Sequence, residues 1–149
     1  MPVHHDRIGR TPDRVKDRPT WLISRVHARS SALLAAGFET RGEGLRGYHY
    51  RLLAALDQWG PTSQADLGRA TGIDRSDVTA ALTDLESRHL VDRKVDPHHK
   101  RRNVVTLTPE GTKALLHLDE VLDEIQAAVL APLTAAQQRQ LLDLLSRIA

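Results

Sequence analysis

The chain has 149 residues, of which 40% are apolar and 27% charged, a composition typical of one folded domain and not of a disordered protein. It contains no cysteine, which excludes disulfides, thiolate metal sites and cysteine nucleophiles. No apolar run approaches the ~20 residues of a transmembrane helix, the start of the chain lacks the apolar centre of a signal peptide, and we expect a cytoplasmic protein. The net charge is only +2, so an argument for a polyanionic partner depends on where the cations lie.

The N-terminal third of the chain is predicted to contain an arm and two helices. Residues 1–19 lack periodicity, and we expect a flexible arm with at most a short helical piece around residues 13–18. Apolar residues then recur at helical spacing, and Gly37 offers a stop, so residues 20–38 are predicted to form the first long helix. Residues 48–59 form a second helix after a glycine-rich loop. Its inward-facing residues are predicted to be Leu52, Leu53 and Leu56.

Residues 63–88 have the pattern of a helix-turn-helix. Ser63 and Asp66 fit a capping box at the start of a short helix, which Gly72 ends. Asp74 can cap the next helix, whose apolar residues recur at spacings of four and three. These inward-facing residues are Val78, Leu82 and Leu85. The side chains on the intervening face are short or polar, which lets the helix approach base edges in a DNA groove. The candidate base-reading residues on it are Arg75, Ser76, Asp77, Thr79 and Thr83.

A basic β-hairpin is predicted after the helix-turn-helix. Residues 90–94 and 103–107 are rich in β-forming types, and the segment between them is turn-forming and strongly cationic. Cations on such a wing contact phosphates or enter the minor groove, which raises affinity and salt dependence more than base selectivity. The candidate wing contacts are Lys94, His98, His99, Lys100, Arg101 and Arg102. The alternative interpretation is a solvated turn that binds nothing.

Two helices are predicted at the C-terminal end. Residues 108–110 provide an N-cap, a proline at the first helical position and an acid in the first turn. Pro132 ends this helix, and Thr134 with Gln137 caps the last one. The apolar seams of the two helices carry more surface than a domain of this length should leave exposed, which predicts a dimer. The predicted dimer contacts are Leu115, Leu118, Leu122, Ile125, Val129, Leu141 and Leu145.

From residue 45 to the C-terminus the chain resembles the MarR family of winged helix-turn-helix transcriptional regulators. Three segments carry the resemblance: the helix that ends at Trp59, SQADLGRATGIDRSDVTAALTDLESRHLV, and DRKVDPHHKRRNVVTLTPEG. In the last segment an Asp-Pro tip, basic residues, a β-return and Leu-Thr-x-x-Gly follow in the family's order. One position departs from the family, because His99 stands where an Asp commonly orients the wing arginine by a salt bridge. The resemblance implies that Arg101 is the minor-groove residue.

The fold class that follows is mainly α (α+β): a winged helix-turn-helix with a two-stranded β wing, and N- and C-terminal helices that form a dimerisation region. We divide the chain into an arm at residues 1–19 and a single domain at residues 20–149. Within that domain, residues 20–38 and 109–149 are the dimerisation helices and residues 45–108 the DNA-binding lobe. The resemblance implies homodimers that place two recognition helices in successive major grooves of a palindromic operator, with half-sites about 10 bp apart.

The resemblance also implies a small-molecule effector, often aromatic and anionic, that enters the crevice between the dimer helices and the DNA-binding lobe and releases the DNA. The residues that border this crevice and suit such a ligand are Trp21, Arg25, His27, Tyr48, His49 and Tyr50. For each aromatic residue, a position in the core is the alternative. Trp21 and Asp66 could also fill two roles known from a urate-responsive branch of the family, although Asp66 already has a place in the capping box.

No metal site, cofactor or catalytic constellation is predicted. His98 and His99 are neighbours, and neighbours on a strand point to opposite faces, so they would not share one ion. The acidic residues of the penultimate helix are not paired with a nucleophile. We therefore expect a DNA-binding transcriptional regulator without enzymatic activity, and specifically a homodimeric repressor released by a ligand. The alternative is a winged-helix module for protein interaction or dimer scaffolding, without specific DNA binding.

Overall fold

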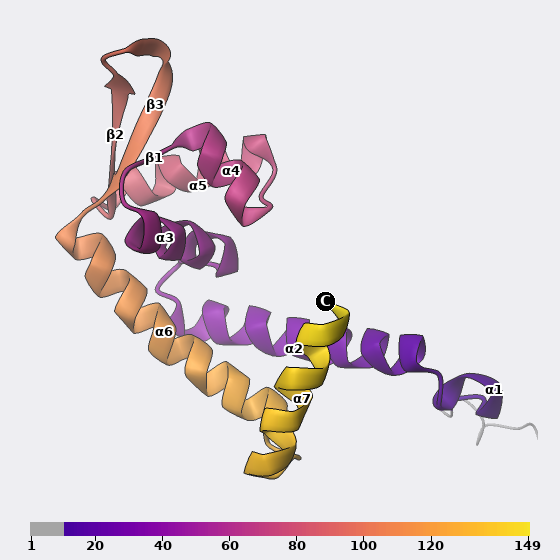
Figure 1. Cartoon of the computed structure of the whole chain (residues 1–149). Coiled ribbons are helices and arrows are strands. Elements are labelled where there is room, and N and C mark those ends of the chain that lie inside the picture. Colours follow the sequence, from indigo (N-terminus) through magenta and orange to yellow (C-terminus); the bar gives the residue numbers. More distant parts are fainter. Residues whose placement is uncertain (1–10) are drawn as a thin grey trace, which may run out of the picture.

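The structure, a computed structural model, describes residues 11–149, which form seven helices and a small antiparallel sheet (Figure 1). The helices are α1 (Asp13–Lys16), α2 (Pro19–Arg41), α3 (Gly47–Trp59), α4 (Gln64–Thr71), α5 (Arg75–Ser87), α6 (Pro109–Leu130) and α7 (Ala135–Ile148). The strands are β1 (Thr62–Ser63), β2 (Val91–Asp96) and β3 (His99–Leu107). Helix α1 confirms the predicted short helical piece, whereas the first ten residues of the predicted arm lie outside the described residues.

The mainly helical winged helix-turn-helix is confirmed, with one more strand than predicted. The sheet order is β1-β3-β2. Strand β1 pairs with β3 through Thr62 opposite Val105 and Ser63 opposite Val104. The two predicted wing strands therefore belong to a three-stranded sheet, and β1 ties the base of the wing to the start of α4.

The predicted helix ends agree with the structure except at Gly37. Helix α2 continues through Gly37 to Arg41. A Cβ at Gly37 would lie 2.5 Å from side-chain atoms of Ile125 in α6, which is too close for any real carbon contact. The glycine therefore allows α2 and α6 to approach each other and does not end the helix. By contrast, Gly72 follows α4 in the left-handed conformation with φ 67°, as a terminating glycine does.

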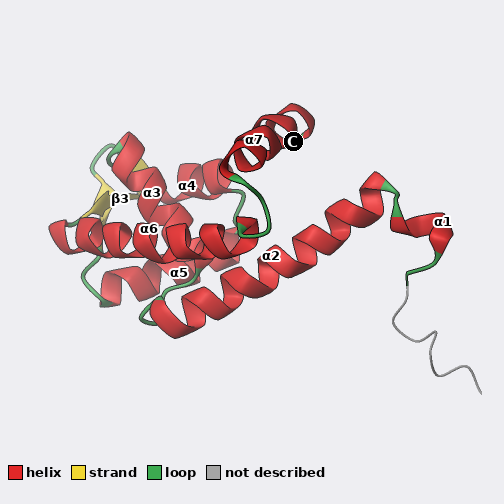
Figure 2. Ribbon diagram, turned by 90° about the horizontal axis from the view of Figure 1, so that it is seen from below, coloured by secondary structure: helices red, strands yellow, loops and turns green. Residues whose placement is uncertain are grey.

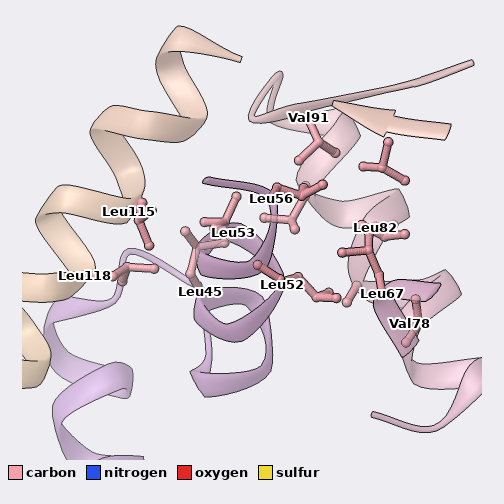
Figure 3. Packing of buried hydrophobic residues seen from close by; sticks show 14 of the residues in the cluster. Leu45, Leu52, Leu53, Leu56, Leu67, Val78, Leu82, Val91, Leu115 and Leu118 are labelled. Atoms are coloured by element: carbon pink, nitrogen blue, oxygen red, sulfur yellow. The ribbon is translucent and has the colours of Figure 1, made fainter. Parts of the chain in front are cut away.

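Helix α3 lies at the centre of the hydrophobic core (Figure 3). Its predicted inward-facing leucines are fully buried, as are those of α5. Figure 3 shows Leu115 and Leu118 of α6 on one side of α3, and Leu67, Val78 and Leu82 of the helix-turn-helix on the other. Burial of such side chains contributes roughly 1.5–3 kcal/mol each. The core thus joins the helix-turn-helix to α6 through α3.

The apolar seam of α6 is filled by helices of the same chain. Leu115, Leu118 and Ile125 are only 5%, 0% and 6% exposed within the single chain, and Leu122 and Val129 are partly buried against the same core. The prediction that this seam is exposed for a second copy is therefore wrong for the three buried residues. The heptad-like spacing shows that a helix packs along the seam but not which chain supplies that helix.

Two other apolar surfaces remain exposed. On the N-terminal half of α2, Leu22, Ile23 and Val26 are 50–57% exposed. Helix α7 has no buried residue, although one side of it is leucine-rich. Figure 2 shows the N-terminal half of α2 and the whole of α7 projecting from the packed helices. The exposed apolar residues of α7 are Leu142, Leu144, Leu145 and Ile148, while Leu141 is half-buried.

Candidate nucleic-acid interface

Helix α5 presents its polar face to solvent because its apolar face is held by the core. Asp74 occupies the N-cap position, and its carboxylate accepts a hydrogen bond from the Ser76 hydroxyl at 2.7 Å. This bond lowers the pKa of Asp74, so the carboxylate stays charged at the helix N-terminus, where a negative charge is stabilising. The predicted base-reading residues are all exposed, namely Arg75, Ser76, Asp77, Thr79 and Thr83.

The hydroxyl groups on this face are already held by neighbouring elements. Gln64 of α4 donates its amide Nε2–H to the Thr79 hydroxyl oxygen at 2.9 Å. Arg93 of β2 donates to the Thr83 hydroxyl oxygen at 3.1 Å. Within residues 11–149, the side chains of Arg75 and Asp77 have no hydrogen-bonding or ionic partner. The charged groups near the start of α5 are thus free to contact a ligand, while the threonines are oriented by the protein.

Three consecutive cations of the wing lie in a bulge of β3 and not at the hairpin tip. Opposite residues of β2 and β3 keep a regular register as far as Val95 and Asn103, and the next pair is Asp96 with His99. Three exposed residues of β3 therefore have no partner on β2, namely Lys100, Arg101 and Arg102. The turn itself is only Pro97 and His98. Asp96 accepts the His98 backbone N–H at 2.9 Å, which lowers the pKa of its carboxyl group and closes the tip.

Two ion pairs fix the wing against the helix-turn-helix. Arg93 of β2 lies 3.1 Å from Glu86 of α5, and the backbone N–H of Arg93 also donates to this carboxylate at 3.1 Å. The Arg93 guanidinium lowers the pKa of Glu86, which therefore remains an anion at neutral pH. Arg102 of β3 lies 3.0 Å from Asp66 of α4. One strand of the wing is thus attached to the reading helix and the other to the helix before it.

Asp66 does more than the predicted capping box requires. Its backbone N–H donates to the Ser63 hydroxyl oxygen at 3.1 Å, which confirms the hydroxyl half of the box. Its carboxylate accepts a hydrogen bond from that hydroxyl at 2.6 Å and pairs with Arg69 and Arg102. The Ser63 hydroxyl is the largest cause of the lowered pKa of Asp66. The i, i+3 spacing could have indicated the Arg69 pair, but the sequence carries no signal for the Arg102 pair.

A surface groove of about 720 Å³ runs between α4, the start of α5 and β3. Four guanidinium groups line it, from Arg69, Arg75, Arg101 and Arg102, and among the described residues Asp74 is the single lining carboxylate. Arg69 is not among the residues predicted from the sequence for DNA contact. A concave surface with this charge attracts phosphate groups and concentrates them near the reading helix.

The residues predicted for a ligand crevice do not gather in this groove or in the second cavity of the single chain. A cavity of about 680 Å³ between α3 and α5 is lined by Tyr48 and His49, but not by the other four. Tyr50 donates its hydroxyl to Asp119 of α6 at 2.8 Å, and burial together with this bond raises its pKa. The remaining three, Trp21, Arg25 and His27, lie on the projecting half of α2.

His49 is a buried structural histidine, only 3% exposed. Its Nδ1 accepts the Arg46 backbone N–H at 2.9 Å, and its Nε2 lies 3.0 Å from a carboxylate oxygen of Asp84 in α5. Burial is the main cause of its lowered pKa, so the ring is neutral at pH 7. Asp84 also pairs with Arg88, which donates to the Glu43 carbonyl at 2.8 Å. The start of α3 is thereby connected to the reading helix.

Other kinds of site have little support in the described part of the chain. Residues 11–149 contain no group of three or more His, Cys, Asp or Glu residues that could hold a metal ion. No helix in the same range is long and apolar enough to cross a membrane.

Comparison with known proteins gives consistent matches. Residues 43–102 match the sequence model of the MarR family. The HTH-type transcriptional repressor NicR of Pseudomonas putida is 26% identical over 141 residues, which are 95% of this chain and 88% of NicR. A probable transcriptional regulator from Pseudomonas aeruginosa has 33% identity and a TM-score of 0.75, over 89% of this chain and 98% of that one. BpsR of Bordetella bronchiseptica, whose DNA binding is regulated by 6-hydroxynicotinic acid, has 26% identity and a TM-score of 0.71, over 85% of this chain and 95% of its own.

Proposed function

The chain belongs to the MarR family of transcriptional regulators, and from this premise we propose that it is a homodimeric repressor that binds a palindromic DNA operator and leaves it when a small anionic aromatic molecule binds. Each protomer places α5 in a major groove and the cations of the β3 bulge on the flanking phosphates or in the minor groove. The two half-sites then lie about 10 bp apart.

The observation that supports DNA binding most directly is the position of the wing relative to α5. Arg75 at the start of α5 lines the same groove as Arg101 and Arg102 of the bulge, and the Arg93–Glu86 and Arg102–Asp66 pairs hold the wing against the helix-turn-helix. A DNA-binding protein whose two contact surfaces are held together before binding loses less conformational entropy when the complex forms. A winged helix used only for protein interaction has no need of four arginines around this groove.

Replacing Arg101 by Ala tests the DNA contact. We expect weaker binding to every duplex, cognate or scrambled, and a salt dependence reduced by about one unit of slope, because one phosphate contact is lost. Fluorescence anisotropy at several salt concentrations measures both quantities. Lys113→Ala, a change of the same charge on the exposed side of α6, is the matched control and should leave the slope unchanged. If the wild-type protein binds no duplex at low salt, the interaction-module alternative is correct.

The proposed dimer rests on the exposed apolar residues of α2 and α7. Leu22, Ile23 and Val26 are at least half exposed, and α7 buries no residue in the single chain. A protein of this size rarely leaves two such helical surfaces in water, so a second copy that covers both is the simplest occupant. Leu141 and Leu145 remain candidate contacts on this surface, whereas the buried residues of the α6 seam do not.

The proposed effector class is taken from BpsR, in which 6-hydroxynicotinic acid regulates DNA binding. Dimerisation would place α2 of one chain beside the other and complete a crevice with Trp21 and Arg25, which line neither the α4–α5–β3 groove nor the cavity between α3 and α5. Titration of 6-hydroxynicotinic acid and benzoate into a protein–duplex complex tests the proposal. Release of the duplex by either compound, and its loss in Arg25→Ala, would support the site, whereas unchanged release in that variant would remove Arg25 from it.

A further inference from the structure

The bulge of β3 raises the question of what keeps its cations in place. Lys100, Arg101 and Arg102 have no partner residue on β2, so the ladder that stabilises the rest of the wing is interrupted there. Long cationic side chains on a flexible loop lose conformational entropy when they bind. Within the described residues the Arg101 side chain has no hydrogen-bonding or ionic partner. The bulge therefore needs an attachment outside the β2–β3 ladder.

The attachment is the carboxylate of Asp66. One of its oxygens, Oδ2, lies 3.0 Å from Arg102 Nη2 and accepts the Ser63 hydroxyl at 2.6 Å. Ser63 is itself buried, caps α4 and pairs with Val104 two residues beyond Arg102. Ser63, which belongs both to the sheet and to the helix cap, thus fixes the Asp66 carboxylate. The carboxylate in turn restrains Arg102, the last residue of the bulge.

We propose that Asp66 is a positioning residue for DNA binding, which holds Arg102 against α4 and thereby keeps Arg101 directed at the duplex. This inference rests on the proposed function and adds a role that the sequence did not indicate. In this arrangement Arg102 is a structural cation of the wing, and Arg101 is the cation left for the phosphates.

The proposal predicts an effect opposite in sign to simple electrostatics. A carboxylate beside a DNA-binding surface repels phosphates, so its neutralisation alone should tighten binding. If Asp66 positions the wing, Asp66→Asn instead weakens binding to the duplex, by about fivefold, the range expected when one partly exposed ion pair is lost. Asp92→Asn on the exposed side of β2 removes the same charge from the wing without this contact, and should bind equally well or more tightly.

Asp66→Asn is compared in the wild-type protein and in an Arg102→Gln protein, which separates the positioning of Arg102 from other effects of losing the carboxylate. With Arg102→Gln already present there is no cation for Asp66 to hold, so adding Asp66→Asn should leave the affinity unchanged or raise it. The duplexes are one selected from a random library by the wild-type protein and one of scrambled sequence, measured by anisotropy at two salt concentrations. An Asp66→Asn effect of the same size in both backgrounds, or tighter binding in the wild-type background, would overturn the proposal.

A measurement on the free protein makes the result independent of DNA. Nitrogen-15 relaxation of the amides of residues 99–103 should show lower order in Asp66→Asn and in Arg102→Gln than in the wild type, whereas Asp92→Asn should not change it. Arg102→Gln leaves α4 untouched, so it remains informative if Asp66→Asn does not fold. If the wild type binds no duplex, the proposed function fails, and unchanged order of these amides would reject the positioning role separately.

Discussion

Gly111→Ala should destabilise the protein although it replaces glycine in a helix. Gly111 lies in the first turn of α6 and donates its N–H to the Thr108 hydroxyl oxygen at 3.0 Å. A Cβ on it would lie 2.1 Å from the carbonyl oxygen of Leu90 and 2.6 Å from Cδ1 of Leu107. Because real Cβ atoms do not come closer than 3.0 Å, the start of α6 would have to withdraw from the base of the wing by about 0.9 Å. This contact explains why a glycine ends the Leu-Thr-x-x-Gly motif.

The expected magnitude follows from three contributions. Overpacking against backbone costs about 1–3 kcal/mol. The Leu90 carbonyl also accepts the Thr108 N–H at 3.1 Å, and displacement of α6 weakens this bond by about 1 kcal/mol. Alanine recovers about 1 kcal/mol of helix propensity. The net loss in the free energy of unfolding is therefore about 1–3 kcal/mol, which corresponds to a decrease in Tm of about 3–10 °C for a chain of this length.

Urea unfolding followed by circular dichroism at one fixed protomer concentration measures this loss, because stability linked to dimerisation depends on concentration. Gly47→Ala is the matched control. It lies at the first position of α3, where the nearest atom to an added Cβ is Cε2 of Phe38 at an ordinary 3.9 Å. Gly47→Ala should be as stable as the wild type or slightly more so. A Gly111→Ala protein with unchanged or increased stability would refute the steric argument.

Three further predictions concern α5, His49 and α7. Arg75→Ala should change the sequences enriched from a random duplex library, since Arg75 is exposed near the start of the reading helix; the same enriched set as for the wild type would exclude base contact. Burial lowers the pKa of His49 in the folded protein below 6.5. The neutral ring therefore contributes its full stabilisation above about pH 6.5, and this contribution is lost as the pH falls through the lower folded-state pKa. In His49→Gln the free energy of unfolding should depend less on pH between about pH 7.5 and 5. Leu145→Asp should raise the dissociation constant of the dimer at least about tenfold, measured by analytical ultracentrifugation, whereas Gln140→Asp on the same helix should not.

The helices and their ends could largely be predicted from the sequence because they depend on local chemistry. Capping residues, helix-breaking prolines and the spacing of the buried residues in α5 are read from neighbouring positions. The structure agrees with them, except that the Asp74 side chain makes no capping hydrogen bond. Gly37 was misinterpreted because a glycine that ends a helix and one that admits a second helix look the same in a sequence. The difference lies in Ile125, which is 88 positions away along the chain.

The details of the candidate site depend on pairing between distant segments, which local patterns do not contain. The β-forming types of the wing were predicted, but the bulge is a property of register and appears only when both strands are aligned. Arg102 looked like one more cation for DNA, and its bond to Asp66 requires α4 and β3 to lie side by side. Likewise, the α6 seam was correctly seen as apolar, but its burial by α2 and α3 depends on the tertiary arrangement.

The bulge of β3 has a further consequence, for the behaviour of the protein at high concentration. Strand β1 covers β3 at Val104 and Val105, and beyond these residues nothing else in residues 11–149 pairs with either edge of the β2–β3 ribbon. Open edges pair with strands of other molecules and begin aggregation. Three consecutive cations in an irregular stretch oppose such pairing, because a second ribbon would meet like charge and a broken hydrogen-bond pattern. We therefore expect the wing to resist fibrillar self-association through the same residues that give it its charge.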